Sequence, residues 1–190
     1  MLQKAALKPG ETVLMHAAGS GVTTAGIQIA KLLDATVITT AGSDEKLAKA
    51  KALGADYTIN YKTQNFVEET KTIAGRHGVD LVFDHIGPDT FAGNMKVLRW
   101  GGRIVMCGST TGGEVALNLR AVFFKRISII GSTMGPKSDQ LTVWKLLSQG
   151  RLKPVVDRVF PVRRVAEAHE YIESRQAFGK VVLDLTEWEA

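Results

Sequence analysis

The sequence has very little cysteine and no long apolar run. Its 190 residues include a single cysteine, Cys107, which excludes a disulfide framework and a zinc site built from several cysteines. No segment approaches the roughly 18 to 20 apolar residues of a membrane span. The lysine-bearing start, residues 1–10, lacks the apolar core of a signal peptide. We therefore expect a protein that does not cross a membrane, and the reducing cytoplasm as its natural setting.

Charge of one sign is not concentrated anywhere along the chain. The 24 Lys and Arg residues against 19 Asp and Glu give a net charge of +5, and the positive residues are spread out. A solvated surface explains this balance, which would suit an anionic small ligand and does not favour nucleic acid as a partner. With 45% hydrophobic and 23% charged residues, the composition is that of a globular domain with a sizeable core.

Apolar segments alternate with amphipathic ones along most of the chain. The apolar run at 12–17 is typical of a buried strand, and residues 21–33 carry apolar side chains at helical spacing. Five further strands, with helices between them, are expected at 36–40, 57–60, 79–84, 103–107 and 127–130. This alternation predicts an α/β fold: a doubly wound, six-stranded parallel sheet in the order 3-2-1-4-5-6, with its ligand across the carboxyl ends of the strands.

The pattern changes after Pro154. Residues 155–162 are expected to be extended, 163–174 helical and 180–185 a short strand, and they do not continue the strand–helix unit. We therefore predict a nucleotide-binding domain over residues 1–152 and a tail over residues 153–190 that packs on something else.

A glycine-rich turn joins the first strand to the first helix. Glycine lets the backbone approach a pyrophosphate closely, and the free N–H groups of a helix N-terminus favour an anion. The strict G-x-G-x-x-G spacing is not met, because Thr24 takes the place of the third glycine, so an ordinary tight turn is the alternative. The residues predicted to bind the phosphates are Gly19, Ser20, Gly21, Val22 and Thr23.

The end of the second strand lacks the acidic residue of an NAD site. Asp or Glu at this point hydrogen-bonds the ribose 2′-OH, and the chain has Ala41 there. Ser43 could donate a hydrogen bond to a 2′-phosphate, and Lys46 could supply a positive charge. We therefore predict NADP(H) in preference to NAD(H). In the alternative reading, Ser43 only caps a helix and Lys46 is solvated.

Two more loops follow strands at the same edge of the sheet. Asp84 and Ile86 follow the fourth strand, Gly108 and Ser109 follow the fifth, and all four are predicted to line the cofactor cleft. His85 could act as an acid or base, although a loop histidine that shapes the cleft is the simpler interpretation. We find no metal-ligand spacing, so no metal is predicted, and the sequence assigns no catalytic residue.

Eight short motifs are spread along the chain: LKPGETVL (7–14), IQIAK (27–31), AGSDEK (41–46), LGAD (53–56), NYK (60–62), GGR (101–103), GSTMG (131–135) and FGKVVL (178–183). Together they resemble the medium-chain dehydrogenase/reductase superfamily, which includes zinc alcohol dehydrogenases and quinone oxidoreductases. The motifs cover most of the chain, and the resemblance is greatest to the branch whose phosphate turn reads G-S-G-V. Thr23 departs from the glycine common there.

The resemblance implies further site residues and a partner. In NADP-using members, a tyrosine like Tyr61 joins the serine and lysine in holding the 2′-phosphate. Loops like 108–109, together with residues like Ser132, Thr133 and Met134, lie near the nicotinamide. A strand like 127–131 pairs with its twin to form a homodimer, which an unpaired strand edge makes physically reasonable.

The resemblance also implies that a domain is absent. Members carry an N-terminal domain of comparable size, which holds the substrate pocket and any catalytic zinc. The chain begins just before the cofactor domain, so its tail is expected to return to the absent domain, and the chain alone to bind cofactor with feeble turnover. The implied reaction is hydride transfer between NADP(H) and a quinone, an enone or an alcohol/carbonyl pair.

Two other classes remain as alternatives. A non-catalytic module that binds a nucleotide, a partner or nucleic acid fits the mild positive charge, but basic and aromatic residues do not interleave as nucleic-acid binding would require. A methyltransferase-like fold also begins with a glycine turn. The end of the second strand argues against it, because no acidic residue there awaits a ribose.

Overall fold

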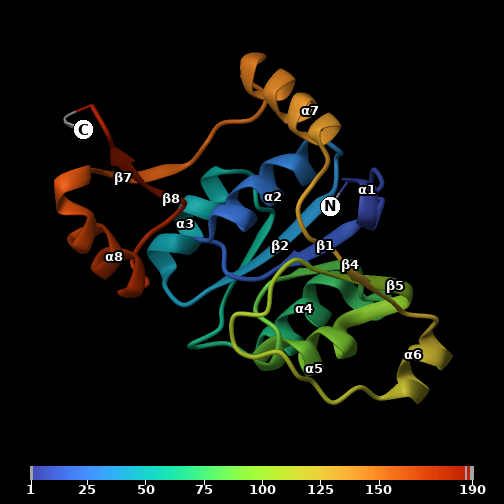
Figure 1. Ribbon diagram of the computed structural model, residues 1–190. Coiled ribbons are helices and arrows are strands. Elements are labelled where there is room, and N and C mark those ends of the chain that lie inside the picture. Colours follow the sequence, from blue (N-terminus) through green and yellow to red (C-terminus); the bar gives the residue numbers. More distant parts are fainter. Residues whose placement is uncertain (1, 187, 189–190) are drawn as a thin grey trace.

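Six parallel strands form one sheet in the order β3-β2-β1-β4-β5-β6 (Figure 1). The computed structural model describes residues 2–186 and 188. The strands are β1 (Thr12–Met15), β2 (Thr36–Ala41), β3 (Tyr57–Asn60), β4 (Val79–Asp84), β5 (Leu98–Met106) and β6 (Ser128–Gly131). The predicted fold class and strand order are confirmed.

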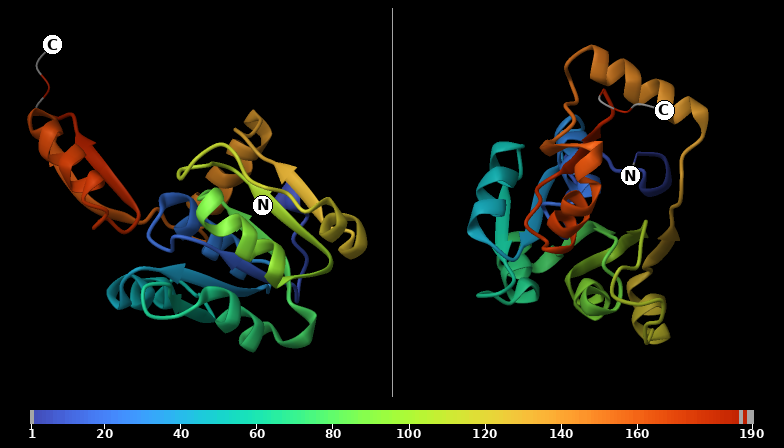
Figure 2. Two further views of the ribbon diagram at one scale, coloured as in Figure 1. Left: turned by 90° about the horizontal axis from the view of Figure 1, so that it is seen from below. Right: turned by 60° about the vertical axis from the view of Figure 1, so that its left-hand side comes forward.

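Helices cover both faces of the sheet (Figures 1 and 2). On one face lie α2 (Gly21–Lys31) and α3 (Asp44–Ala52), and on the other lie α4 (Phe66–Ala74) and α5 (Pro88–Val97). The remaining helices of this part are α1 (Leu2–Ala5), the 3-10 turn η1 (Gly75–His77), α6 (Leu119–Lys125) and α7 (Lys137–Ser148). The sequence pattern predicted neither α1 nor α6, both of which are too short to show a helical period.

Side-chain caps determine where the principal helices begin. Ser20, Ser43 and Asn65 precede α2, α3 and α4, and each accepts a hydrogen bond from a backbone N–H of the first turn. Pro88 occupies the first turn of α5, where its missing N–H costs nothing. These caps set three helix N-termini at the carboxyl ends of the preceding strands, which is the edge where a ligand can bind.

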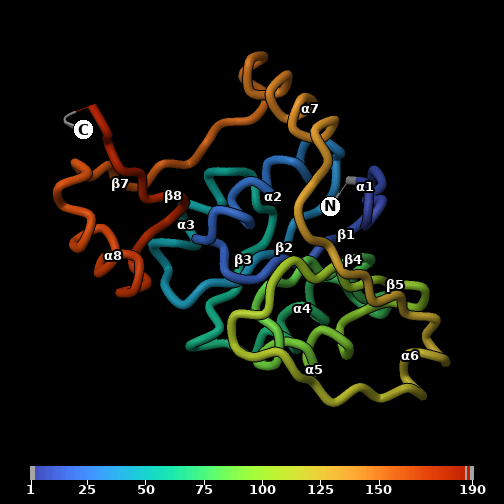
Figure 3. The backbone as a smooth tube through the Cα atoms, in the orientation of Figure 1, coloured from blue at the N-terminus to red at the C-terminus, as the bar shows by residue number. Residues whose placement is uncertain are grey.

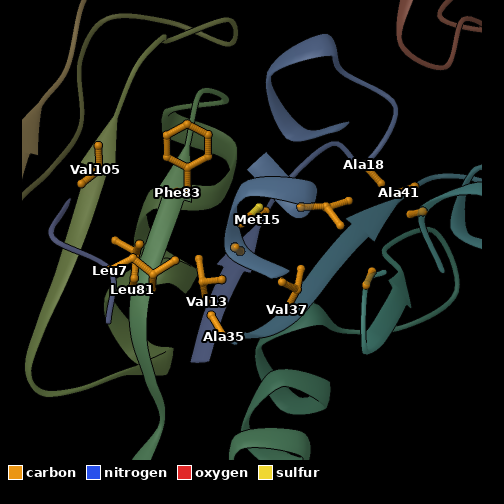
Figure 4. Packing of buried hydrophobic residues seen from close by; sticks show 14 of the residues in the cluster. Leu7, Val13, Met15, Ala18, Ala35, Val37, Ala41, Leu81, Phe83 and Val105 are labelled. Carbon is orange, nitrogen blue, oxygen red and sulfur yellow. The ribbon is translucent and has the colours of Figure 1, made fainter. Parts of the chain in front are cut away.

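The core lies on both sides of the sheet. Successive strand residues point to opposite faces, so Val13 and Met15 pack towards α2 while Leu14 packs towards α4 and α5. Figure 4 shows the first of these layers, where β1 side chains lie beside Val37 and Leu81 of the neighbouring strands. Because both faces of β1 are buried, Val13, Leu14 and Met15 are apolar in succession instead of alternating with polar residues. None of the helices in the described chain is long and apolar enough to cross a membrane.

The fifth strand begins earlier than predicted, at Leu98 instead of Arg103. The pairing of β4 with β5 shifts register between Val79 and Leu81, and Gly101 has a φ of +70° in this irregular stretch. The glycine pair at 101–102 concealed the start of the strand, because glycine in a strand usually marks an interruption.

The tail forms a separate lobe beside the main sheet (Figures 2 and 3). It contains β7 (Val156–Pro161), the 3-10 turn η2 (Val162–Arg164), α8 (Val165–Glu173) and β8 (Lys180–Asp184), with β7 and β8 paired in parallel. Several of its apolar side chains are exposed, among them Val156, Val159, Ile172, Val182 and Leu185. Residues 175–180 of the tail return to the main domain, where the Phe178 side chain joins the buried core and Gly179 lies beside the glycine-rich turn.

Candidate functional site

The glycine-rich turn between β1 and α2 is held by a chain of hydroxyl groups. The Ser20 hydroxyl accepts from the Thr23 backbone N–H at 3.0 Å and donates to the Thr23 hydroxyl at 2.9 Å. The Thr23 hydroxyl in turn donates to the His16 carbonyl at 2.7 Å. The Thr23 side chain is therefore buried beneath the turn and shapes it, which explains how the turn accommodates a threonine in the place of a glycine. Gly19 and Gly21 are half-buried, and Val22 is exposed.

The tail crosses directly over this turn. The Gly179 N–H donates to the Gly19 carbonyl at 2.8 Å, and Gly179 forms a parallel bridge with Ser20. A Cβ added at Gly21 would lie 2.7 Å from the Lys180 ammonium nitrogen. Lys180 therefore places a positive charge at the N-terminus of α2, where the helix dipole already favours an anion.

The end of β2 is lined by polar and basic side chains around Gly42. A Cβ added there would lie 2.7 Å from the Tyr61 hydroxyl oxygen and 3.2 Å from Cε of Lys62. Ser43 accepts a hydrogen bond from the Lys46 N–H at 3.4 Å and caps α3. Tyr61 and Lys62 therefore lie close to Gly42, next to the Ser43 cap.

Lys46 lies between the β2 end and the turn. Its ammonium group donates to the Arg175 carbonyl of the tail at 2.6 Å and would be 3.4 Å from a Cβ at Gly19. Burial lowers the pKa of Lys46 from its usual value. Lys46 is therefore closer to the glycine-rich turn than the sequence suggested.

The loops after β4 and β5 are joined to each other. Thr110 and Thr111 donate backbone hydrogen bonds to the carbonyls of His85 and Ile86, at 3.2 and 2.9 Å. The Asp84 side chain points inward and accepts a hydrogen bond of 2.8 Å from the Ile86 N–H, so it fixes the start of the loop after β4. A Cβ at Gly108 would lie 3.2 Å from Cβ of His85, so the two loops pack closely there.

Four predicted residues lie at the outer loops of this edge. Ser109 donates its hydroxyl to the Gly112 carbonyl. The Ser132 N–H donates to the Met106 carbonyl at 2.8 Å, which places the loop after β6 beside the end of β5. Thr133 and Met134 follow it on the surface, and the Met134 side chain is 92% exposed.

All predicted site residues thus lie along the carboxyl edge of the sheet, but the sequence missed three basic ones. Lys62, Arg175 and Lys180 supply charge or backbone groups at this edge. Lys180 belongs to the motif at 178–183, which resembles the ending of the family. Only the folded structure brings the Lys180 side chain close to Gly21. Among the described residues, no group of three or more His, Cys, Asp or Glu could hold a metal ion.

Two buried histidines at this edge predict a pH-dependent stability. Burial lowers the pKa of His16 and of His85 below the usual 6.5, so both are neutral in the folded chain and take up protons on unfolding in mild acid. The free energy of unfolding should fall as the pH drops below about 6.5, by up to about 1.4 kcal/mol per pH unit for each histidine.

Urea unfolding between about pH 5 and pH 8 measures this slope, above the range in which the carboxylates titrate. His85→Asn should make the slope shallower, whereas His169→Asn, on an exposed part of α8, should leave it unchanged. A slope that is the same in all three proteins contradicts the assignment.

The sheet order and the glycine turn at the first helix define a Rossmann-type nucleotide-binding domain. A family model described as zinc-binding dehydrogenase matches residues 21–149. The chain belongs to this family, as the cofactor-binding domain of the medium-chain dehydrogenase/reductase superfamily, and the predicted resemblance is confirmed.

Its relatives are oxidoreductases. A 2-haloacrylate reductase from Burkholderia sp is 35% identical over 189 residues, which cover 93% of this chain and 56% of that protein. Quinone oxidoreductase from Homo sapiens is 31% identical over 190 residues, which cover 96% of this chain and 57% of that protein. The chain therefore spans little more than half the length of these relatives.

Solved structures agree with this family. The structure of an NAD-dependent alcohol dehydrogenase has 46% sequence identity and a TM-score of 0.90, over 96% of this chain and 53% of that one. A 2-octenoyl-CoA carboxylase reductase in complex with NADP and 2-octenoyl-CoA has 28% identity and a TM-score of 0.88, over 94% of this chain and 44% of that one. The first of these proteins is described as NAD-dependent, and the second was solved with NADP bound.

Proposed function

We propose that this chain is the NADP(H)-binding domain of an oxidoreductase that transfers a hydride to or from a quinone, an enone or an alcohol/carbonyl pair. The observation that carries the choice of NADP(H) is the β2 end, where Ser43, Tyr61 and Lys62 surround Gly42. Ala41 stands where an acidic residue would bind the ribose of NAD. The nearby Asp44 accepts a hydrogen bond from the Asn60 side chain at 2.7 Å and is thereby engaged elsewhere.

The residues at the turn fit the rest of the dinucleotide. Positions 19 and 21 lie close to the tail, because a Cβ would be 3.1 Å from the Ala177 carbonyl oxygen at Gly19 and 2.5 Å from Cε of the flexible Lys180 side chain at Gly21. In our proposal the N–H groups of the α2 N-terminus and the Lys180 ammonium bind the pyrophosphate, while Ser43, Tyr61 and Lys62 bind the 2′-phosphate. The bound cofactor supplies the hydride chemistry.

The residues described above are assigned to the cofactor, and the proposed reaction also needs a site for the substrate. The resemblance and the longer relatives support a substrate pocket contributed by a further domain, which orients the substrate against the nicotinamide. In this proposal the exposed apolar side chains of the tail pack on that domain, so the chain alone binds cofactor and turns over feebly. The outer edge of β6, where Ile129 is 40% exposed, pairs with a second copy in a homodimer.

Calorimetric titration of the chain with NADPH and with NADH tests the choice of cofactor. We expect NADPH to bind more tightly, and Lys62→Ala or Lys46→Ala to weaken it by about tenfold or more, the usual cost of losing a charge-assisted hydrogen bond. Lys51→Ala, on an exposed part of α3, is the matched control and should bind NADPH like the wild type.

Lys62→Ala should also leave NADH affinity within about twofold, because NADH has no 2′-phosphate for the lysine to contact. A wild type that prefers NADH would show that the 2′-phosphate site is wrongly assigned. A wild type that binds neither dinucleotide would overturn the proposed function and favour a non-catalytic module.

A further inference from the structure

Three buried polar side chains form a row across the middle of the sheet, just below the candidate cofactor cleft. Met15 is paired with Thr39 on one side and with Phe83 on the other. The residues that follow these three, His16, Thr40 and Asp84, therefore lie side by side at one level, and by strand alternation they face α4 and α5. All three are almost completely buried.

The hydrogen bonds along this row have one direction. Asp84 accepts from the Asn94 side-chain N–H at 2.9 Å, so the carbonyl oxygen of Asn94 must face His16. His16 Nε2 lies 2.7 Å from that oxygen and can only donate to it. His16 Nδ1 is then the acceptor for the Thr40 hydroxyl at 3.1 Å. Each group thus fixes the orientation of the next, and the chain of donors ends at the Asp84 carboxylate.

The row is connected to two segments assigned to the cofactor, the phosphate turn and the loop after β4. The His16 carbonyl accepts from the Thr23 hydroxyl, which holds the phosphate turn. The Thr40 carbonyl accepts from the Ala18 N–H at 2.8 Å, just before that turn. At the other end, the Asp84 carboxylate accepts from the Ile86 N–H and so holds the loop after β4.

We infer that Thr40, His16, Asn94 and Asp84 form a positioning network that fixes the phosphate turn and the β4 loop relative to each other for dinucleotide binding. This inference rests on the proposed function. Buried polar networks act cooperatively, because a member that loses its partner cannot be satisfied by water. Removing Asn94 would leave the His16 N–H without an acceptor and Asp84 short of a donor, and the turn would lose its fixed support.

A double-mutant cycle on NADPH affinity tests the connection between the two loops. Asn94→Leu breaks the row, and Thr23→Val breaks the link from the row to the turn. We expect the fold-loss of NADPH affinity in the double variant to be at least about threefold smaller than the product of the fold-losses in the two single variants, as for members of one network. Thr39→Val is the matched control, since Thr39 is equally buried but bonds the Met15 carbonyl on the opposite face. Combined with Asn94→Leu, it should be additive within about twofold.

Thr40→Val takes the place of Asn94→Leu in the cycle if the latter does not fold. A wild type that binds NADPH with additive losses in both pairs would overturn the network and leave the proposed function standing. A wild type that does not bind NADPH would overturn both.

The tautomer of His16 gives an independent test that needs no variant. Long-range proton–nitrogen correlation spectra of the labelled wild-type chain should show His16 protonated at Nε2 and bare at Nδ1 at neutral pH. This assignment follows from the Asn94 amide, whose N–H group is committed to Asp84. A proton on Nδ1, or on both nitrogens, would reverse or break the row and overturn the inference.

Discussion

Gly78→Ala should destabilise the chain by about 4 kcal/mol. Gly78 lies between η1 and β4 with φ +77° and ψ −172°, a region that only glycine enters readily and that costs other residues about 1 to 3 kcal/mol. A Cβ there would also lie 2.4 Å from the Val97 carbonyl oxygen and 3.0 Å from the Arg99 nitrogen. Both atoms belong to the backbone and cannot turn away, so overpacking adds about 1 to 3 kcal/mol.

Thermal unfolding measures this effect, and a loss of about 10 °C in Tm corresponds to it for a chain of this size. Gly75→Ala is the matched control, because Gly75 has φ +65° and ψ −158° and a Cβ there would have nothing within 4 Å. Its loss should be about half as large, since only the conformational cost applies. Equal losses in the two variants would show that the overlap with Val97 is relieved at no cost.

Gly179→Ala should have the largest effect on cofactor binding. Gly179 has φ +104°, and a Cβ there would lie 2.3 Å from the Val155 carbonyl oxygen. The strain falls on the short stretch where the tail meets the turn, so we expect this stretch to leave the turn and carry Lys180 with it. Loss of that charge should weaken NADPH binding about 10- to 100-fold, the range for charge-assisted hydrogen bonds.

Calorimetry on three variants separates the causes. Lys180→Ala should reproduce most of the loss, because it removes the charge alone. Gly150→Ala, with φ +67° and nothing within 4 Å of an added Cβ, tests a strained glycine elsewhere in the chain and should leave NADPH affinity unchanged. Full NADPH affinity in Gly179→Ala would mean that the tail does not contribute to the phosphate site.

The parts that the sequence predicted well depend on local patterns. The continuous apolar strands and amphipathic helices identified the parallel sheet, because a strand buried on both faces cannot alternate. The glycine turn and the loops after the strands could be placed at one edge, because the carboxyl ends of parallel strands lie together at the same edge of a sheet.

What the sequence did not reveal depends on register and on distant contacts. His16, Thr40 and Asp84 share a level only through the pairing of three strands, and nothing in their spacing along the chain indicates it. Lys180 and Arg175 reach the turn by a path through a separate lobe. The early start of β5 was hidden by a glycine pair that the sheet tolerates at a register shift.

The crossing of the tail over the turn also has a consequence during synthesis. Lys46 and its partner Arg175 are 129 positions apart in the chain, whereas the last strand of the main sheet ends at Gly131. A ribosome that adds about 5 to 20 residues per second lets the sheet assemble seconds before residues 175–180 emerge. The sheet would therefore fold before residues 175–180 are available, and these residues would complete the candidate nucleotide site late in folding.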